Sequence, residues 1–363
     1  MGTAGAAAKP AIELLAHAAL YDCRDGVGQV AAEALGTLGD VAKSSVPLLT
    51  EGLRESQAEV REAAATALGQ LGPIAAPARD ELAACLSDPE TSVRIGAAKA
   101  IGNLGEAAAP VVKQLAAAIK DTIGPDDAYG IGTSEAAKAL QSLGQLSLPA
   151  KDVLVVGLQD PNVRIRAACV EVFGSFGAAA QPFVQKIAAM ALYDSKVEET
   201  AFGRRVSGRE AAIVTLKRLG KDAEGAFPTL MTALSDDKVP DIVAEGAILS
   251  LGALRKVAGP VVTPLTELLG NKQALLRRRG ALALAELGKV ASSSTAKLVE
   301  AMENHLQSDT ELSVAALMAL RNITESKPEV VRPFERKIQA AAQSPDRSVQ
   351  QAAQAVCEML SEE

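Results

Sequence analysis

Apolar residues recur along this chain with the spacing of amphipathic α-helices. Val60, Ala64, Leu68 and Leu71, for example, fall on one face of a helix, while the residues between them are mostly small or polar. Such a helix buries its apolar face only against another helix. The pattern therefore predicts a protein of packed amphipathic helices.

A helix-ending phrase close to A-L-G-x-L-G repeats along the chain. The spacing of its final glycines fits a unit of roughly 33 residues with insertions. We expect each glycine to give its helix a left-handed C-terminal residue. The predicted repeats end near residues 39, 72, 105, 144, 177, 220, 252, 288, 324 and 360.

Each repeat holds two helical segments joined by a turn. The first often opens near a proline, such as Pro77 or Pro149, and the turn often contains Asp-Pro, as at Asp88-Pro89. A helix pair this thin cannot bury its own apolar face, whereas stacked pairs can. We therefore predict an all-α fold, an α-α superhelix of about ten two-helix repeats that forms a single solenoid over residues 1–363.

Composition and charge agree with thin, closely packed helices. Alanine supplies 70 of the 363 residues and aromatic residues only 2 %, which disfavours a β-sandwich or barrel. No apolar run is long enough to span a membrane. The net charge of −7 favours a soluble protein and makes nucleic acid an unlikely partner.

The repeat resembles the HEAT-repeat, armadillo-like family in its bacterial form, D-P-x-x-x-V-R-x-x-A-A-x-A-L-G-x-L-G. The match is closest from Asp88 to Gly105. This resemblance implies a structural arginine near the start of each second helix that pairs with turn carboxylates. The arginines at that position are Arg61, Arg94, Arg166, Arg209 and Arg277. It says little about function, because one fold hosts many roles.

Two repeats are longer than the others. Their extra residues, 121–132 and 193–208, fall between the two helices of a repeat, so both loops should emerge on one edge. The three tyrosines of the chain fall at this edge. Because tyrosine suits interfaces, we expect the edge to bind a partner. The alternative is that each tyrosine merely caps a helix end. The candidate residues are Tyr21, Tyr129, Tyr193, Phe202, Arg204 and Arg205.

The second helices are expected to line a concave groove. The residue two before the closing glycine is small or polar and uncharged in the first five repeats, which suits a peptide or a partner helix. An unselected solvent face is the alternative. The residues of this row are Thr37, Gln70, Asn103, Ser142 and Ser175.

Basic residues concentrate between positions 201 and 300. Of Arg277, Arg278 and Arg279, one should belong to the structural arginines, while the others face solvent, because adjacent residues point 100° apart on a helix. The stretch 204–279 therefore offers an alternative function as an anion- or nucleic-acid-binding module.

Residues for catalysis or metal binding are scarce. The only histidines are His17 and His305, and the four cysteines are too far apart in sequence for a recognisable metal motif. We expect the cysteines to fill helix interfaces, and we predict no catalytic residue, metal or cofactor. A lyase-type enzyme subunit stays a minor alternative, because that chemistry leaves little motif to test.

The sequence thus predicts a non-catalytic protein–protein interaction scaffold or adaptor. Another protein or a peptide would bind through the concave groove and the two long loops. We expect a cytoplasmic location, although export after removal of a signal peptide stays open.

Overall fold

The structure is a computed structural model that describes residues 2–22, 26–122, 134–199 and 205–361. Their helices form ten consecutive pairs, from α1 with α2 to α20 with α21, so the all-α repeat fold is confirmed. The chain divides into two compact units: unit 1 holds residues 1–179 and 196–208, and unit 2 holds residues 180–195 and 209–363. The single solenoid over the whole chain stays a prediction.

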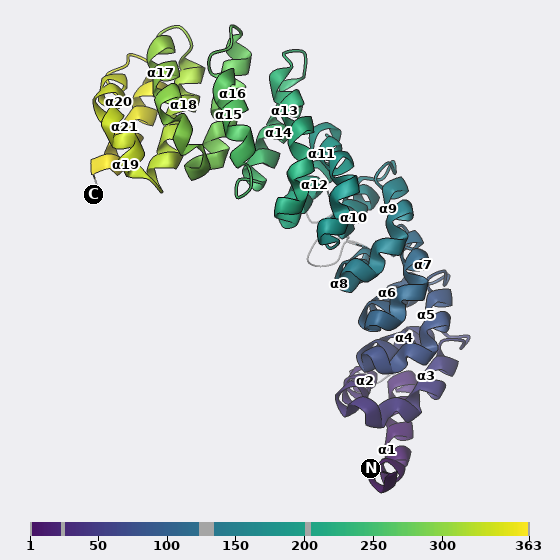
Figure 1. Cartoon of the computed structure of the whole chain (residues 1–363). Helices are drawn as coiled ribbons and strands as arrows, with labels where there is room; N and C mark the ends of the chain where they lie inside the picture. Colours follow the sequence, from purple (N-terminus) through teal and green to yellow (C-terminus); the bar gives the residue numbers. More distant parts are fainter. Residues whose placement is uncertain (1, 23–25, 123–133, 200–204, 362–363) are drawn as a thin grey trace. The chain divides into compact units, whose positions relative to one another are not determined.

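In unit 1 the helices form two layers (Figure 1). The second helices pack side by side: α2 (Val27–Leu38), α4 (Ala58–Leu71), α6 (Thr91–Asn103), α8 (Glu135–Leu143) and α10 (Val163–Phe173). The first helices cover them: α1 (Gly2–Tyr21), α3 (Val46–Gly52), α5 (Arg79–Cys85), α7 (Val112–Ala117) and α9 (Lys151–Gly157). Fully buried side chains such as Leu68, Leu82 and Ile101 form the core between the layers.

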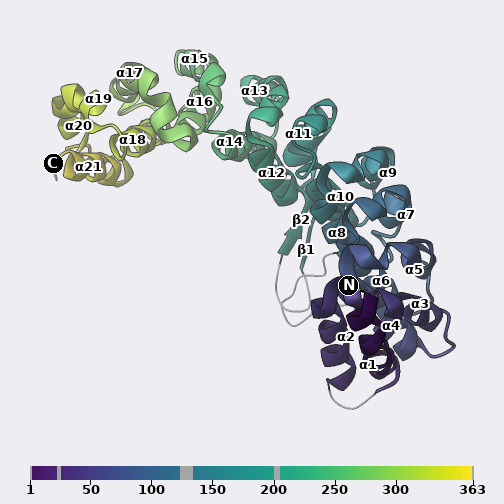
Figure 2. The same cartoon turned by 60° about the horizontal axis from the view of Figure 1, so that its bottom comes forward.

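Unit 2 repeats this two-layer arrangement (Figure 2). Its first layer holds α11 (Val184–Tyr193), α13 (Phe227–Ser235), α15 (Gly259–Leu268), α17 (Thr295–His305), α19 (Pro328–Val331) and α20 (Glu335–Ala341). Its second layer holds α12 (Gly208–Leu219), α14 (Asp241–Ala253), α16 (Ala274–Leu287), α18 (Thr310–Thr324) and α21 (Arg347–Ser361).

Short 3₁₀ helices carry the chain from one repeat into the next. They are η1 (Gly39–Ser45), η2 (Gly72–Ala78), η3 (Gly105–Val111), η4 (Gly144–Ala150), η5 (Gly177–Phe183), η6 (Gly220–Ala226) and η7 (Gly288–Ser294). A further 3₁₀ helix, η8 (Arg332–Phe334), lies within the tenth repeat, between α19 and α20. Pro77 and Pro149 lie in η2 and η4, two residues before the α-helices that they were expected to open. Proline fits near the end of a 3₁₀ turn because its ring fixes φ close to the helical value.

The two glycines of the repeated phrase have different structural roles. The last one adopts a positive φ, as at Gly72 (φ 56°, ψ −132°) and Gly144 (φ 57°, ψ −126°). The positive φ was predicted, but ψ near −130° is not the left-handed helical region; it resembles the first central residue of a type II′ turn. Only glycine adopts this conformation without strain.

The glycine three residues earlier lets neighbouring second helices approach closely. A Cβ atom on Gly36 would lie 2.7 Å from the backbone oxygen of Gln70, and one on Gly102 would lie 2.8 Å from the Cβ of Ala139. Both distances are too short for real Cβ atoms. The first glycine of the phrase is therefore required by helix packing.

Gly252 was expected to end the seventh repeat, but it is a packing glycine. Its φ is not positive, and a Cβ atom there would lie 2.8 Å from the Oε2 of Glu286 on the next second helix. Helix α14 continues to Ala253. The position of the closing glycine is thus occupied by Arg255, and the repeat ends three residues later than predicted.

The long insertion of the sixth repeat contains a β-hairpin that was not predicted from the sequence. Strands β1 (Val197–Glu199) and β2 (Arg205–Ser207) pair antiparallel, with Val197 opposite Ser207. Both strands pack against α10 within unit 1, and Arg164 of that helix forms an ion pair of 2.9 Å with Glu198.

The arginines that begin the second helices connect successive turns, as the family resemblance implied. Arg61 donates two hydrogen bonds, of 2.7 and 2.8 Å, to the carboxylate of Asp88 in the next repeat and others to the carbonyls of its own turn. Arg94 binds its own turn in the same way and reaches the carbonyl of Asp121. The equivalent arginines Arg166, Arg209 and Arg277 also bind turn or helix-end carbonyls.

Adding a single methyl group at Gly36 should destabilise unit 1. Glycine to alanine in a helix usually stabilises by about 1 kcal/mol, but in Gly36→Ala the new Cβ must displace the backbone of Gln70. We expect a net loss of about 1–2 kcal/mol in the free energy of unfolding, measured by urea denaturation. Gly259→Ala is the control, because no atom lies within 4 Å of that Cβ; equal effects of the two substitutions would contradict the packing role.

The Arg61–Asp88 pair should contribute stability that depends on pH. Its hydrogen bonds hold the pKa of Asp88 below the ordinary value. A carboxylate with a depressed folded-state pKa stabilises the fold above its unfolded pKa of about 4, and this contribution is lost as pH falls through the folded pKa.

Thermal unfolding between pH 6 and pH 3 checks this expectation. The melting temperature of the wild type should fall more steeply below pH 5 than that of Arg61→Gln, whose Asp88 titrates closer to its ordinary pKa. Lys151→Gln, an exposed change elsewhere in unit 1, should follow the wild type. Parallel curves for the wild type and Arg61→Gln would show that the pair contributes nothing measurable.

Candidate interaction surfaces

Two adjoining hollows lie on the second-helix layer of unit 1. The larger, of about 680 Å³, extends from the end of α1 over α2 and α4, and the smaller, of about 440 Å³, lies over α4 and α6. Both are lined by Glu62 and Thr66 of α4, so they adjoin at this helix, and together we call them the unit 1 groove. Its other polar lining residues include Gln29, Gln57, Glu59, Gln70, Thr91, Ser92 and Lys99.

The chemistry of the unit 1 groove is polar and slightly acidic. Asp22, Glu59 and Glu62 contribute three carboxylates against the single ammonium group of Lys99, and amides and hydroxyls make up most of the remaining polar lining. These groups accept hydrogen bonds and attract cationic side chains. Glu62 and Thr66 were not predicted as site residues, because they lie ten and six residues before the closing glycine and only the position two before it was expected to face a groove.

The expected polar row is largely engaged within the protein itself. The hydroxyls of Thr37, Ser142 and Ser175 each donate to the carbonyl three residues earlier in the chain. Asn103 donates from its side-chain amide to the carbonyl of Gly69 in the preceding second helix, at 3.1 Å. Gln70 is the member of this row that lines a hollow.

Asn103 has a counterpart in unit 2. Asn322 occupies the same repeat position and donates to the carbonyl of Ala285 at 2.9 Å. Each amide therefore joins the C-terminal ends of two successive second helices. At this position asparagine has a structural role, which was not predicted from the sequence.

Two of the three tyrosines lie in the described part of the chain. Tyr21 lines the unit 1 groove, its ring centroid lies 5.9 Å from that of His17, and its hydroxyl lies 3.4 Å from Glu55. Desolvation, together with the negative charge of Glu55, raises the pKa of Tyr21. Tyr193 ends α11 in unit 2 with 62 % of its surface exposed. Tyr129 lies outside the described residues, so the row of tyrosines stays a prediction.

The two insertions are described only at their bases. The hydroxyls of Thr122 and Ser134, which bound the insertion of the fourth repeat, lie 2.8 Å apart in a buried hydrogen bond. In the other insertion Arg205 is exposed on β2, whereas Phe202 and Arg204 lie outside the described residues. The common edge of the two insertions stays a prediction.

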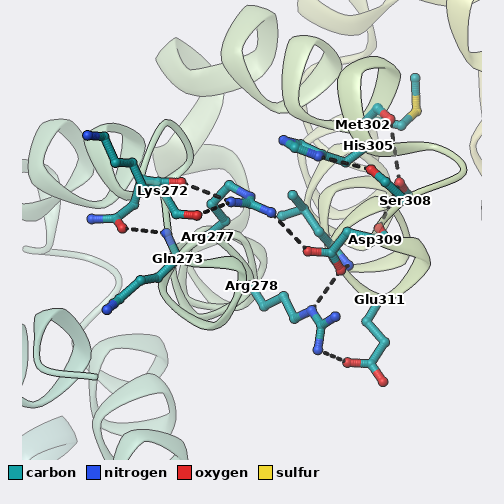
Figure 3. A network of polar contacts seen from close by, with 12 residues as sticks. Lys272, Gln273, Arg277, Arg278, Met302, His305, Ser308, Asp309 and Glu311 are labelled. Carbon is teal, nitrogen blue, oxygen red and sulfur yellow. Dashed lines mark hydrogen bonds and ion pairs between the residues drawn. The ribbon is translucent and has the colours of Figure 1, made fainter. Parts of the chain in front are cut away.

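The prediction that two of the arginines at 277–279 face solvent is wrong. Arg277 and Arg278 both pair with Asp309, at 3.4 and 2.7 Å, and Arg278 also pairs with Glu311 (Figure 3). Arg279 is buried and donates to the carbonyls of Asp236 and Val239 and to the carboxylate of Asp241. The three guanidinium groups thus hold turns of unit 2 together, which removes them from the predicted anion-binding stretch.

Asp309 is the centre of this network. Burial favours the neutral form of its carboxyl group, but the hydrogen bonds from Arg278 and from the backbone N–H of Leu312 favour the ionised form more strongly. The pKa of Asp309 is therefore lowered. Its side chain is the N-cap of α18 as well, so one carboxylate organises both the turn and the start of the helix.

The described cysteines lie in or beside the helix packing. Burial raises the pKa of the Cys85 thiol to about 11 and that of Cys169 to about 12, so both are protonated at neutral pH and poor nucleophiles. Across the described ranges no group of three or more His, Cys, Asp or Glu side chains is arranged to hold a metal ion. No described helix is both long and apolar enough to cross a membrane.

Comparison with known proteins identifies the repeat. The family model for HEAT repeats matches residues 12–78 and 46–123, whereas no curated protein sequence matches the chain.

Solved structures of Kap121p have a similar fold. Kap121p covers 98 % of this chain with a TM-score of 0.62 at 13 % sequence identity. Kap121p bound to Nup53p and the karyopherin Kap121p bound to the SUMO protease Ulp1p give TM-scores of 0.63 and 0.64, again at 13 % identity. This chain spans 46 % of the length of each. Residues 12–123 therefore contain HEAT repeats, and the chain has the all-α fold of a HEAT-repeat solenoid.

Proposed function

We propose that this chain is a non-catalytic protein-interaction scaffold that binds a basic, polar peptide segment in the unit 1 groove. The observation that carries the proposal is the pair of adjoining hollows over α2, α4 and α6, which share Glu62 and Thr66 as lining residues. Glu59 and Glu62 attract lysine and arginine, and the surrounding amides and hydroxyls suit the polar groups of a peptide.

The fold supports this role. The structures similar to this chain include Kap121p bound to Nup53p and to Ulp1p, so a HEAT-repeat solenoid of this kind binds proteins. In this proposal the two insertions extend the contact along one edge of unit 1, with Tyr21 at the groove and Arg205 on the insertion of the sixth repeat. The partner would then contact both the second helices and the loops, as predicted from the sequence.

Reversing the charge of Glu62 should weaken peptide binding. We would select peptides from a display library on the full-length wild-type chain and measure their affinities by fluorescence anisotropy. Basic peptides should be enriched, and Glu62→Lys should bind them about tenfold more weakly, because the substituted side chain repels cations in both hollows. Asp152→Lys is the matched control, since this exposed carboxylate lies on α9 in the first-helix layer of unit 1. Peptides that bind Glu62→Lys as tightly as the wild type would refute the groove site.

The contribution of the fourth-repeat insertion can be tested separately. Because Thr122 and Ser134 already lie in hydrogen-bond contact, residues 123–133 can be replaced by a short glycine linker without moving α7 or α8. Helicity and melting temperature should stay unchanged, while affinity for the selected partner should fall several-fold. Unchanged affinity at unchanged stability would restrict the site to the groove.

A further inference from the structure

The first four second helices of unit 2 each have an exposed apolar residue at the same position of the repeat. This position lies six residues before the end of the repeat. The four repeats end at Gly220, Arg255, Gly288 and Thr324. The residues at this position are Val214, Leu249, Leu282 and Met318, with exposed fractions of 51, 42, 36 and 47 %. We call these four residues the unit 2 stripe.

The repeat itself does not require an apolar residue there. In unit 1 the same position holds Glu33, Thr66, Lys99, Lys138 and Glu171, and these repeats fold into the same layers. Single exposed apolar residues are ordinary on protein surfaces, but an aligned row of them marks an interaction site. Folding alone therefore does not account for the stripe.

The stripe crosses neighbouring helices and adjoins a hollow. Helices α14, α16 and α18 pack side by side in unit 2, at a spacing of roughly 8–10 Å. Between Leu282 and Met318 lies a hollow of about 340 Å³, which Val314 and Ala315 also line. The pair formed by Arg278 and Glu311 borders this hollow and is satisfied internally. An apolar side chain can enter here without leaving a buried charge unpaired.

The spacing of the stripe favours a helical partner. Seven residues of an α-helix advance about 10.5 Å, so a helix lying along the stripe would bring an apolar residue to each repeat. A β-strand advances about 10 Å in three residues, which matches the helix spacing. Because its side chains alternate between two faces, contacts three residues apart would lie on opposite faces of the strand. A polyproline helix has a suitable pitch, but its known sites are lined by aromatic residues, and the stripe has none.

Charges beside the stripe define the flanks of this partner. On the side toward the N-termini of the second helices, Glu210 and Glu245 lie four residues before Val214 and Leu249. On the opposite side, Lys217 and Arg321 lie three residues after Val214 and Met318. A repeat between these two contributes Glu286 to the same side. At the position four residues before Leu282 lies Arg278, which is paired with Asp309 and Glu311. The acidic side is therefore limited to α12 and α14, where it is complementary to lysine or arginine on that flank of the partner helix.

We propose that the unit 2 stripe binds an amphipathic α-helix of a partner protein. This helix has large apolar residues seven positions apart and basic residues on the flank that faces Glu210 and Glu245. An apolar side chain of the partner fills the hollow between Leu282 and Met318. The proposal depends on the scaffold function only in that the ligand is a protein, and it does not depend on the unit 1 groove.

A selection experiment tests the proposal on the full-length chain. One display library fixes leucine at seven-residue spacing in helix-forming peptides and randomises the flanking positions; a second fixes the same leucines at two-residue spacing. The first library should give binders enriched in lysine and arginine on one flank. The double variant Leu282→Glu/Met318→Glu should bind these peptides at least tenfold more weakly. Val156→Glu, which changes a 73 % exposed apolar residue on α9 of unit 1, should bind them like the wild type.

Further variants distinguish the stripe from the unit 1 groove and from self-association of the chain. Glu245→Lys should weaken the basic-flanked peptides and should favour versions with acidic flanks. Glu62→Lys should leave their binding unchanged, so that failure of the groove and failure of the stripe are distinguishable. No enrichment from the first library, or binders that the double variant retains, would overturn the proposal. So would a concentration-dependent dimer of the wild type that the double variant abolishes in sedimentation, because a second copy would then cover the stripe.

Discussion

The close approach of successive second helices is the constraint on which the rest of the structure depends. Gly36 and Gly102 permit it by having no Cβ atom, and alanine keeps most of the remaining interface thin. Because so little side-chain volume lies between the helices, polar contacts at the ends of the helices supply much of the specificity of their packing. These are the arginine–turn contacts at the start of five of the second helices and, in two repeats, the asparagine amide at the end of the helix.

Because polar contacts specify the packing, many polar side chains of this chain have a structural role. Arg61, Arg94 and the three arginines at 277–279 donate hydrogen bonds to carbonyls and carboxylates of the turns. The run of arginines at 277–279 is therefore not a basic surface in the fold. The surfaces that we propose for partners are the middle portions of the second helices, and they differ between the units: polar with excess carboxylate in unit 1, apolar in unit 2.

The sequence predicted the repeat, its two helices and its structural arginines, because each follows from a local pattern recurring about every 33 residues. It misplaced the end of the seventh repeat, since the phrase around Gly252 retains its packing glycine but lacks the closing one. The hairpin at 197–207 was not predicted because two strands of three residues leave no periodic signal. The groove and the stripe depend on alignment between repeats, and that alignment requires the correct repeat ends.

The closing glycines have one further consequence, which concerns chirality. Their φ near +56° with ψ near −130° is the mirror image of a conformation that L-residues favour. A D-amino acid would fit these positions without strain and would also restrict the unfolded chain. Ribosomal synthesis supplies no D-residue, and glycine, being achiral, is the substitute. Seven repeats of this solenoid thus end at a site that demands the opposite hand, and the repeat that ends at Arg255 connects to the next by a different turn.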